Sequence, residues 1–150
     1  MEATAAHRKT AEVLLVEDNP GDVRLTQEAF LEVKPSVHLS VAVDGVGAMA
    51  FLKREGAHAD APRPDLILLD LNMPRMDGRE VLARIKQDDN LRTIPVVILT
   101  TSDLEGDIAK SYHLHANSYV CKPVELRAFE NLVKSINDFW LTKAKLPQPA

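Results

Sequence analysis

Residues 66–70 read Leu-Ile-Leu-Leu-Asp, an uninterrupted apolar run that ends in a carboxylate. Apolar runs of the same kind lie at residues 13–16 and 96–99. None of the three runs alternates with polar residues, which is typical of strands that helices cover on both faces of a parallel sheet. The three runs therefore predict the central strands of a parallel β-sheet.

Two weaker candidates extend this sheet to five strands. Residues 37–43 alternate between apolar and polar side chains, which indicates an edge strand, and residues 118–120 form a shorter candidate. The complete set of strands is expected at residues 12–16, 37–43, 65–70, 95–100 and 118–120.

Each predicted strand leads into a segment with helical periodicity. The helices are expected at residues 20–33, 46–55, 78–88, 105–114 and 124–141. Capping signals precede three of them, namely Asn19-Pro20, Asp77 with Glu80, and Ser102 with Glu105. This (βα)5 alternation predicts an α/β fold, a doubly wound five-stranded parallel sheet with helices on both faces.

Length and charge limit the classes of function. The chain has 150 residues, which suits one domain, and its 18 Lys and Arg against 22 Asp and Glu give a net charge of −4. This charge argues against broad electrostatic binding to nucleic acid or to a membrane surface. No apolar run approaches the ~18 residues of a membrane span, and residues 1–10 lack the apolar core of a signal peptide. Cys121 is the single cysteine, so we expect no disulfide and a cytoplasmic location.

The domain boundaries follow from the outermost elements. We expect a flexible N-terminal segment at residues 1–10, one domain at residues 11–142 and a C-terminal tail at residues 143–150. Residues 53–64 contain Gly56, Pro62 and Pro64 and are expected to form a polar connector.

Polar side chains stand at the carboxyl ends of four predicted strands: Glu17 and Asp18, Asp70, Thr100, and Lys122. In an open α/β sheet these ends share one edge, where ligands bind. Crowded carboxylates repel unless a cation lies among them, and oxygen ligands favour Mg²⁺ over zinc. Taken alone, Asp18 also suits a helix cap and Thr100 a satisfied loop hydroxyl. Their joint placement instead suggests phosphoryl chemistry, with Lys122 and Thr100 on the phosphoryl oxygens.

These residues resemble the receiver domain of two-component response regulators over about residues 13–140. Residues 70–78, Asp-Leu-Asn-Met-Pro-Arg-Met-Asp-Gly, look like the phosphoacceptor loop of that family, and Glu17-Asp18 resembles its acidic pair. Thr100 and Tyr119 match its switch residues, and Lys122-Pro123 matches its Lys-Pro pair. The resemblance implies a flavodoxin-like strand order 2-1-3-4-5.

The same resemblance implies a role for each residue. Asp70 would accept a phosphoryl group from a sensor histidine kinase. Glu17, Asp18, Asp70 and the backbone carbonyl of Asn72 would hold Mg²⁺, and Lys122 and Thr100 would bind the phosphoryl oxygens. Movement of Thr100 would open space for Tyr119, so the protein would signal by a packing switch. It would not be an enzyme, although it would assist its own phosphorylation and dephosphorylation. The resemblance also favours a cis Lys122–Pro123 bond.

Two residues of these motifs depart from the pattern of the family, and three residues beside the motifs have simple structural interpretations. Glu17 replaces the more frequent Asp of the acidic pair, and Thr101 stands where the family often has a smaller residue, which bears on the rate of dephosphorylation. Cys121 is expected to be a buried small side chain, and His113 and His115 are expected at the surface near the end of a helix.

The chemistry of these residues argues against two other classes of protein, and one further interpretation stays open. A flavodoxin-type phosphate loop would not carry Glu17-Asp18, which repel phosphate. A haloacid-dehalogenase-like phosphatase would need a second Asp where Asn72 stands. A receiver that acts purely as a binding module, without phosphorylation, remains the other interpretation.

The last helix predicts how the signal leaves the domain. Residues 126, 129, 133, 136 and 140 are apolar and share one helical face. We expect a homodimer or kinase-facing patch on residues 105–114, 118–120 and 124–141, made of Leu132, Phe139, Trp140, Leu141, Ile108 and Tyr112. The alternative is a helix packed deeply into its own domain. With no second domain after this helix, the chain resembles a stand-alone regulator, and residues 139–142 with the Pro-rich loop resemble regulators partnered with phytochrome-type kinases.

Overall fold

The computed structural model describes residues 10–34 and 36–147, so almost all of the predicted N-terminal segment, together with residues 148–150 of the tail, lies outside the described residues. In chain order the elements are β1 (Ala11–Val16), α2 (Pro20–Leu31), β2 (Val37–Ala42), α3 (Gly45–Leu52), η1 (Gly56–His58), β3 (Leu66–Leu69), α4 (Gly78–Gln87), β4 (Val96–Thr100), α5 (Glu105–His113), β5 (Ser118–Cys121), α6 (Leu126–Asp138) and η2 (Phe139–Lys143).

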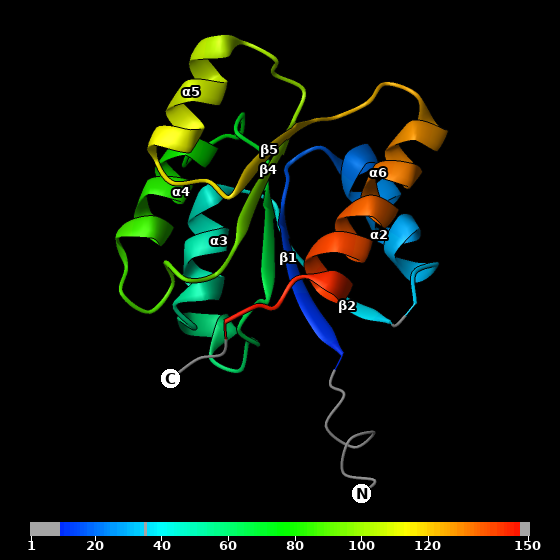
Figure 1. Cartoon of the computed structure of the whole chain (residues 1–150). Helices are drawn as coiled ribbons and strands as arrows, with labels where there is room; N and C mark the ends of the chain where they lie inside the picture. Colours follow the sequence, from blue (N-terminus) through cyan, green and yellow to red (C-terminus); the bar gives the residue numbers. More distant parts are fainter. Residues whose placement is uncertain (1–9, 35, 148–150) are drawn as a thin grey trace, which may run out of the picture.

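The strands form one parallel sheet in the order β2-β1-β3-β4-β5, and both the (βα)5 fold and the strand order are confirmed. Strand β2 lies at one edge of the sheet, as its alternating sequence predicts. Helices α3, α4 and α5 cover one face of the sheet, and α2 and α6 cover the other (Figure 1). Because all strand pairs are parallel, the carboxyl ends of the strands share one rim of the molecule.

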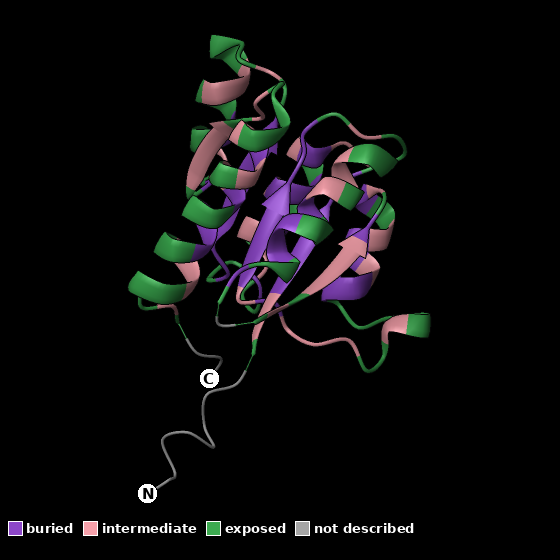
Figure 2. Ribbon diagram, turned by 90° about the vertical axis from the view of Figure 1, so that its right-hand side faces the viewer, coloured by how far each residue is buried: buried purple, intermediate pink, exposed green. Residues whose placement is uncertain are grey.

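The central strands have no polar face because each face contacts a separate apolar core. Leu14 and Val16 pack into the core that α3 and α4 complete, whereas Val13 and Leu15 pack into the core that α2 and α6 complete. All four residues of β3 and all five of β4 are buried, so the centre of the sheet is buried throughout (Figure 2). Burying one such side chain contributes about 1.5–3 kcal/mol, so these runs contribute strongly to the stability of the domain.

The helix starts agree with the capping signals only in part. Asn19 caps α2 as predicted, because its side-chain oxygen accepts a hydrogen bond from the Asp22 amide at 3.0 Å. Asp77 caps α4 by accepting from the Arg79 amide at 2.6 Å. The predicted capping box is incomplete, however, since Glu80 pairs with Arg84 at 2.8 Å instead of reaching back.

The predicted capping box of α5 is wrong. The helix begins at Glu105 with Leu104 as its N-cap residue, and no side chain caps it. Ser102 lies two residues before this N-cap position and donates its hydroxyl to Asp107 at 2.6 Å. A bond to a side chain five residues ahead, which Arg79 of α4 also contacts, therefore replaces the cap that the spacing of Ser102 predicts.

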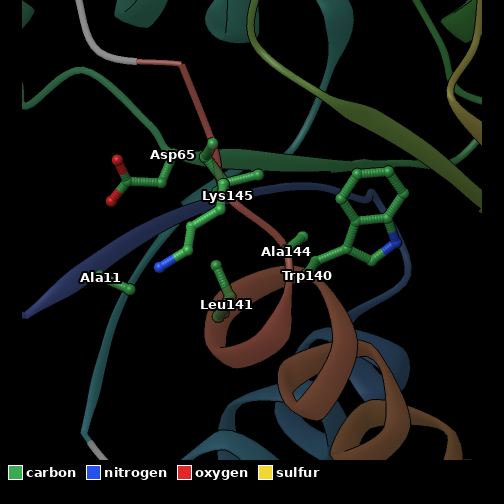
Figure 3. Close-up of a pocket in the computed structure, with 7 residues that line it drawn as sticks. Ala11, Asp65, Trp140, Leu141, Ala144 and Lys145 are labelled. Atoms are coloured by element: carbon green, nitrogen blue, oxygen red, sulfur yellow. The ribbon is translucent and has the colours of Figure 1, made fainter.

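The last helix is shorter than its apolar pattern predicts. Helix α6 ends at Asp138 and continues as the π-helical turn η2. Phe129, Val133 and Ile136 are buried, but Leu126 is 53% exposed because it lies in the first turn, at the rim of the sheet. Trp140 packs against the core under α2 and α6 and lines a cavity of about 260 Å³ together with Leu141, Asp65 and Ala11 (Figure 3).

Two further predictions about side-chain environment have opposite outcomes. His113 and His115 are exposed, as predicted. Cys121 is also exposed, so the prediction of a buried thiol is wrong. It is the last residue of β5, which has no neighbouring strand on its outer side among the described residues, and its Sγ donates to the Ser102 carbonyl at 3.4 Å. Within the described residues, no helix is long and apolar enough to cross a membrane.

Candidate functional site

Three carboxylates meet at the carboxyl rim of the central strands. Glu17 and Asp18 directly follow β1, and Asp70 directly follows β3. The Asp70 amide donates to the Val16 carbonyl at 3.0 Å, which continues the ladder between the two strands and brings the carboxylates together. One carboxylate oxygen from each of Glu17, Asp18 and Asp70 lies within 4.8 Å of the others. The acidic cluster predicted from the strand ends is therefore present.

A buried ammonium lies against this cluster. The side chain of Lys122 is 5% exposed, and its Nζ contacts Glu17 Oε1, Asp22 Oδ2 at 2.9 Å and Asp70 Oδ2 at 3.6 Å. The Lys122 amide donates to the Thr100 carbonyl at 2.7 Å, just beyond the pairing of β4 with β5. The end of the edge strand therefore directs this ammonium toward the centre of the rim.

Burial perturbs both members of the central ion pair. Burial raises the pKa of Glu17 to about 7, although the hydrogen bond and charge of Lys122 act in the opposite direction. Burial lowers the pKa of Lys122, but hydrogen bonds to Glu17 and Asp22 outweigh it and raise that pKa above its ordinary value. The ammonium therefore stays charged at neutral pH, while Glu17 holds a proton far more readily than an exposed carboxyl does.

Thr100 presents an unpaired hydroxyl at the same rim. The residue is fully buried, and its Oγ1 has no hydrogen-bond partner among the described residues. An unpaired buried hydroxyl costs about 1–3 kcal/mol, so proteins seldom keep one without a role. The Thr100 hydroxyl is therefore free, among the described residues, to donate a hydrogen bond, and its role toward a phosphoryl group stays a prediction.

Tyr119 lies on β5, beside the strand that carries Thr100. It is half-buried and packs against the core under α3 and α4. Its hydroxyl donates to the Ser102 carbonyl at 2.9 Å, and its amide donates to the Tyr112 hydroxyl at 3.1 Å. The aromatic ring is therefore tied to the segment that follows Thr100.

Comparison with known protein families matches residues 13–136 to the response regulator receiver domain. The chain belongs to the response regulator receiver family. Response regulator Rcp1 of Synechocystis sp. (strain ATCC 27184 / PCC 6803 / Kazusa) is 49% identical to this receiver over 135 residues, covering 90% of this chain and 92% of Rcp1.

Solved structures of two relatives superpose on this receiver. The phosphorylated cyanobacterial phytochrome response regulator RcpA has a TM-score of 0.91 and 50% identity, covering 93% of this chain and 100% of that structure. The Mn²⁺-bound form of Rcp1 has a TM-score of 0.88 and 48% identity, covering 92% and 99%. The receiver is thus similar to phytochrome response regulators in both sequence and fold.

The acidic cluster of the receiver suits a divalent cation. The atoms that Glu17, Asp18 and Asp70 offer are all carboxylate oxygens, the donors that Mg²⁺ and Mn²⁺ prefer. A cation of charge +2 also offsets the repulsion among carboxylates that lie so close together. Asn72 is exposed in the loop after Asp70, and its role through the backbone carbonyl stays a prediction.

The receiver site contains one carboxylate that the sequence analysis missed. Asp22 lies in the first turn of α2, and it is a direct partner of Lys122. A usable signal was present, because Asp22 follows Asp18 by four residues and the Asn19-Pro20 pair starts a helix between them. One helical turn therefore returns a second acidic side chain to the rim.

Proposed function

We propose that this receiver accepts a phosphoryl group on Asp70 from a sensor histidine kinase in a Mg²⁺-dependent reaction. The observation that carries the proposal is the position of the Asp70 carboxylate. It is 10% exposed, lies 3.6 Å from the buried ammonium of Lys122, and shares the rim with Glu17 and Asp18. A carboxylate held between a fixed ammonium and acidic side chains that suit a divalent cation is suited to attack a phosphorus centre.

Phosphoryl transfer to Asp70 exchanges the P–N bond of the phosphohistidine for a new O–P bond. An Asp70 oxygen attacks the phosphorus of the phosphohistidine, and the new O–P bond forms as the P–N bond breaks. The imidazole leaves with the electron pair of that bond. Lys122 and Thr100 donate hydrogen bonds to the phosphoryl oxygens, where negative charge gathers. Glu17, Asp18, Asp70 and the Asn72 carbonyl would hold Mg²⁺, which supplies charge neutralisation to the phosphoryl oxygens when bound.

We infer that the signal leaves through α5, β5 and α6. Movement of Thr100 toward the phosphoryl group draws the end of β4 with it, and Tyr119 turns into the space. Support for a phytochrome-type kinase as the donor comes from the similarity to RcpA and Rcp1. The alternative, a binding module that is never phosphorylated, predicts no covalent change at Asp70.

Intact mass tests the phosphoacceptor directly. After incubation with acetyl phosphate and Mg²⁺, the wild-type chain is expected to gain one phosphoryl group, and Asp70→Asn is expected to gain none because the amide is not a nucleophile. Asp60→Asn, an exposed change in the loop after α3, is the matched control and should behave as wild type. Omission of Mg²⁺ should abolish the gain.

A gain of equal size in Asp70→Asn would contradict the assignment. No gain from acetyl phosphate or from a panel of phosphorylated kinases would favour the binding-module alternative. Within that panel, equal transfer from all kinases would contradict the phytochrome-type partner.

The hydroxyl of Thr100 gives a second prediction. Thr100→Val keeps the shape of the side chain and removes an unpaired donor, so stability should be unchanged or slightly higher. Phosphoryl uptake should slow by about tenfold to a hundredfold, because a hydrogen bond to a charged group contributes about 1.5–3 kcal/mol. Uptake rates by intact mass, with the exposed Thr93→Val as control, check this. Wild-type uptake in Thr100→Val would show that the hydroxyl has no part in the transfer.

We infer a homodimer through the same face, with a smaller patch than the sequence predicts. Leu132, Trp140 and Leu141 pack against the core of their own domain. Of the remaining residues of the predicted patch, Tyr112 is 48% exposed, Phe139 is 55% exposed and Ile108 is half-buried. The rings of Phe139 and Trp140 are perpendicular to each other, with centroids 5.3 Å apart, so Trp140 supports the exposed Phe139 ring.

Light scattering checks the dimer. The wild-type chain is expected to reach twice the chain mass as concentration rises, and Phe139→Ser is expected to keep the mass of one chain, because the change removes the largest exposed ring of the patch. Leu31→Ser alters a side chain that is 82% exposed on α2, a helix that carries no residue of the inferred patch, and should leave dimerisation intact. A single-chain mass at every concentration, with and without acetyl phosphate, would overturn the inference.

A further inference from the structure

We propose that a cavity at the amino end of the sheet binds a small organic phosphate that carries an aromatic ring, a ligand of the size of a nucleoside monophosphate. The cavity has a volume of about 630 Å³ and lies between the end of α3, the connector before β3 and the turn after α4. Volumes of this order are typical of sites for small organic ligands. The proposal goes beyond the proposed function, because this second site shares no residue with the acidic cluster.

Strand direction separates the cavity from the phosphoacceptor. Pro64 and Leu91, which line the cavity, precede β3 and β4, whereas Asp70 follows β3. Because the strands are parallel, the cavity and Asp70 lie at opposite ends of the sheet. Helices α3 and α4, whose carboxyl ends border the cavity, cover the same face of the sheet (Figure 1). A ligand in this cavity therefore does not occupy the acidic rim.

The buried part of the cavity lining is apolar. It consists of Leu52, Pro64 and Leu91, from the end of α3, the connector and the turn after α4. A flat ring that lies against these side chains removes apolar surface of both partners from water, which favours binding. The lining therefore favours a ligand with a ring over a bare anion.

Three cations line the same cavity, namely Lys53, Arg54 and Arg63. Among the described residues, neither arginine forms an ion pair, and Arg63 Nη2 donates to the neutral Thr93 hydroxyl at 3.3 Å. Lys53 Nζ lies 4.0 Å from Asp88 Oδ2, a long separation for an ion pair. The whole chain has a net charge of −4, so this excess of positive charge is local to the cavity.

Asp88 offsets only a part of this positive charge. Its Oδ1 accepts from the Asn90 amide at 2.8 Å and from the Leu91 amide at 3.1 Å, so one carboxylate oxygen holds the turn after α4. A phosphate monoester carries a charge of about −1.5 to −2 at pH 7. Arginine binds such a group through two parallel hydrogen bonds. The lining therefore matches a phosphate in both charge and donor geometry.

Arg54 has a backbone conformation that favours glycine. Its φ is 56°, its amide donates to the Phe51 carbonyl at 3.2 Å, and the Glu55 amide donates to the Ala50 carbonyl at 2.9 Å. These two bonds form a Schellman motif, in which glycine is the usual residue at the position of Arg54. A Cβ is unfavourable in this conformation, and strain of this kind clusters at binding sites. The guanidinium at the cavity gives the strained arginine a role.

Binding is tested on the full chain in a buffer without divalent cations, so that the acidic rim holds no metal that could attract a phosphate. The probes are AMP, GMP, CMP and UMP, and isothermal titration calorimetry measures their affinities. At least one of these nucleotides is expected to bind. Its own nucleoside and inorganic phosphate should each bind about tenfold more weakly or less, because each lacks one half of the recognised chemistry.

Arg54→Gly separates a binding role from a structural one. Glycine suits the left-handed backbone, so the urea midpoint should rise, while nucleotide affinity should fall by about tenfold or more. Arg63→Gln should also weaken binding. Arg92→Gln is the matched control, because Arg92 lies in the same turn region, pairs with Asp89 at 3.6 Å and does not line the cavity. That variant should bind the nucleotide as the wild type does.

Amide shifts in NMR spectra locate the ligand, and they are expected at residues 52–54, 63 and 88–91. No binding of any of the four nucleotides would overturn the proposal, as would shifts confined to residues 17–18, 70–72 and 122. Equal affinity for inorganic phosphate, or an equal loss in Arg92→Gln, would also overturn it, because general charge attraction would then explain the binding. Phosphoryl uptake on Asp70 is measured separately, so a failure of the proposed function leaves this test unaffected.

Discussion

Gly78→Ala is expected to cost at least about 3 kcal/mol of folding stability, the upper end of the usual range for overpacking. A Cβ at this position would lie 2.1 Å from the Asp70 carbonyl oxygen and 2.7 Å from Leu71 Cα. Both are backbone atoms of the segment that leaves the buried strand β3, so they cannot move aside as a flexible side chain does. The Gly78 amide also donates to the Leu71 carbonyl at 2.9 Å, which draws the two segments together.

Urea unfolding, monitored by circular dichroism, measures this loss in the free energy of unfolding. Gly106→Ala is the matched control, because a Cβ there would meet nothing within 4 Å in the first turns of α5. That variant should gain about 0.5–1 kcal/mol, since alanine loses less conformational entropy in a helix than glycine. Because the displaced atoms belong to Asp70 itself, phosphoryl uptake by Gly78→Ala should also fall. A wild-type midpoint for Gly78→Ala would show that the loop has room to relax.

Lys122→Met is expected to destabilise the protein by about 3 kcal/mol at pH 8, as the removal of one partner of a buried ion pair commonly does. The change leaves the carboxylates of Glu17, Asp22 and Asp70 without the ammonium that they surround. Methionine fills a similar volume, so the loss measures charge rather than packing. The exposed Lys134→Met on α6 is the control and should change stability little.

The cost of Lys122→Met should depend on pH in a defined direction. Glu17 has a folded-state pKa of about 7 against an ordinary value of 4.5, and loss of the ammonium raises the folded value further. The folded state therefore binds more protons than the unfolded state between these values, and stability of the variant falls as pH rises through them. Denaturant midpoints at pH 5 and pH 8 check this. An equal loss at both pH values would mean that Glu17 does not carry the effect.

Local patterns predicted most of the architecture because their cause is local. Residues 66–69 and 96–99 had to be buried on both faces, since they offer no polar side to water, and that requirement places them in the middle of a parallel sheet. Asn19 caps its helix through a bond that spans three residues. The polar residues after each strand could be predicted to share a rim, because parallel strands bring their carboxyl ends together.

Other features depended on contacts between elements distant in the chain. Asp22 became part of the site only because α2 turns it toward Lys122, one hundred residues away. Ser102 has the spacing of a helix cap, yet its hydroxyl donates to Asp107, which also accepts from Arg79, 28 residues away in the chain. A sequence window of a few residues contains no information about Arg79 as a partner of Asp107.

The features of this protein therefore fall into two groups, those that the sequence determined and those that the tertiary structure decided. The sequence by itself determined the fold class, the strand order implied by its resemblance to a known family, and the carboxylates and cation of the rim. Only the tertiary structure decided that Cys121 is exposed, that Trp140 packs against its own domain, and that Thr100 keeps an unpaired hydroxyl. Periodicity reports which side of an element turns inward, whereas exposure at a strand end or helix end depends on which neighbouring element reaches that far.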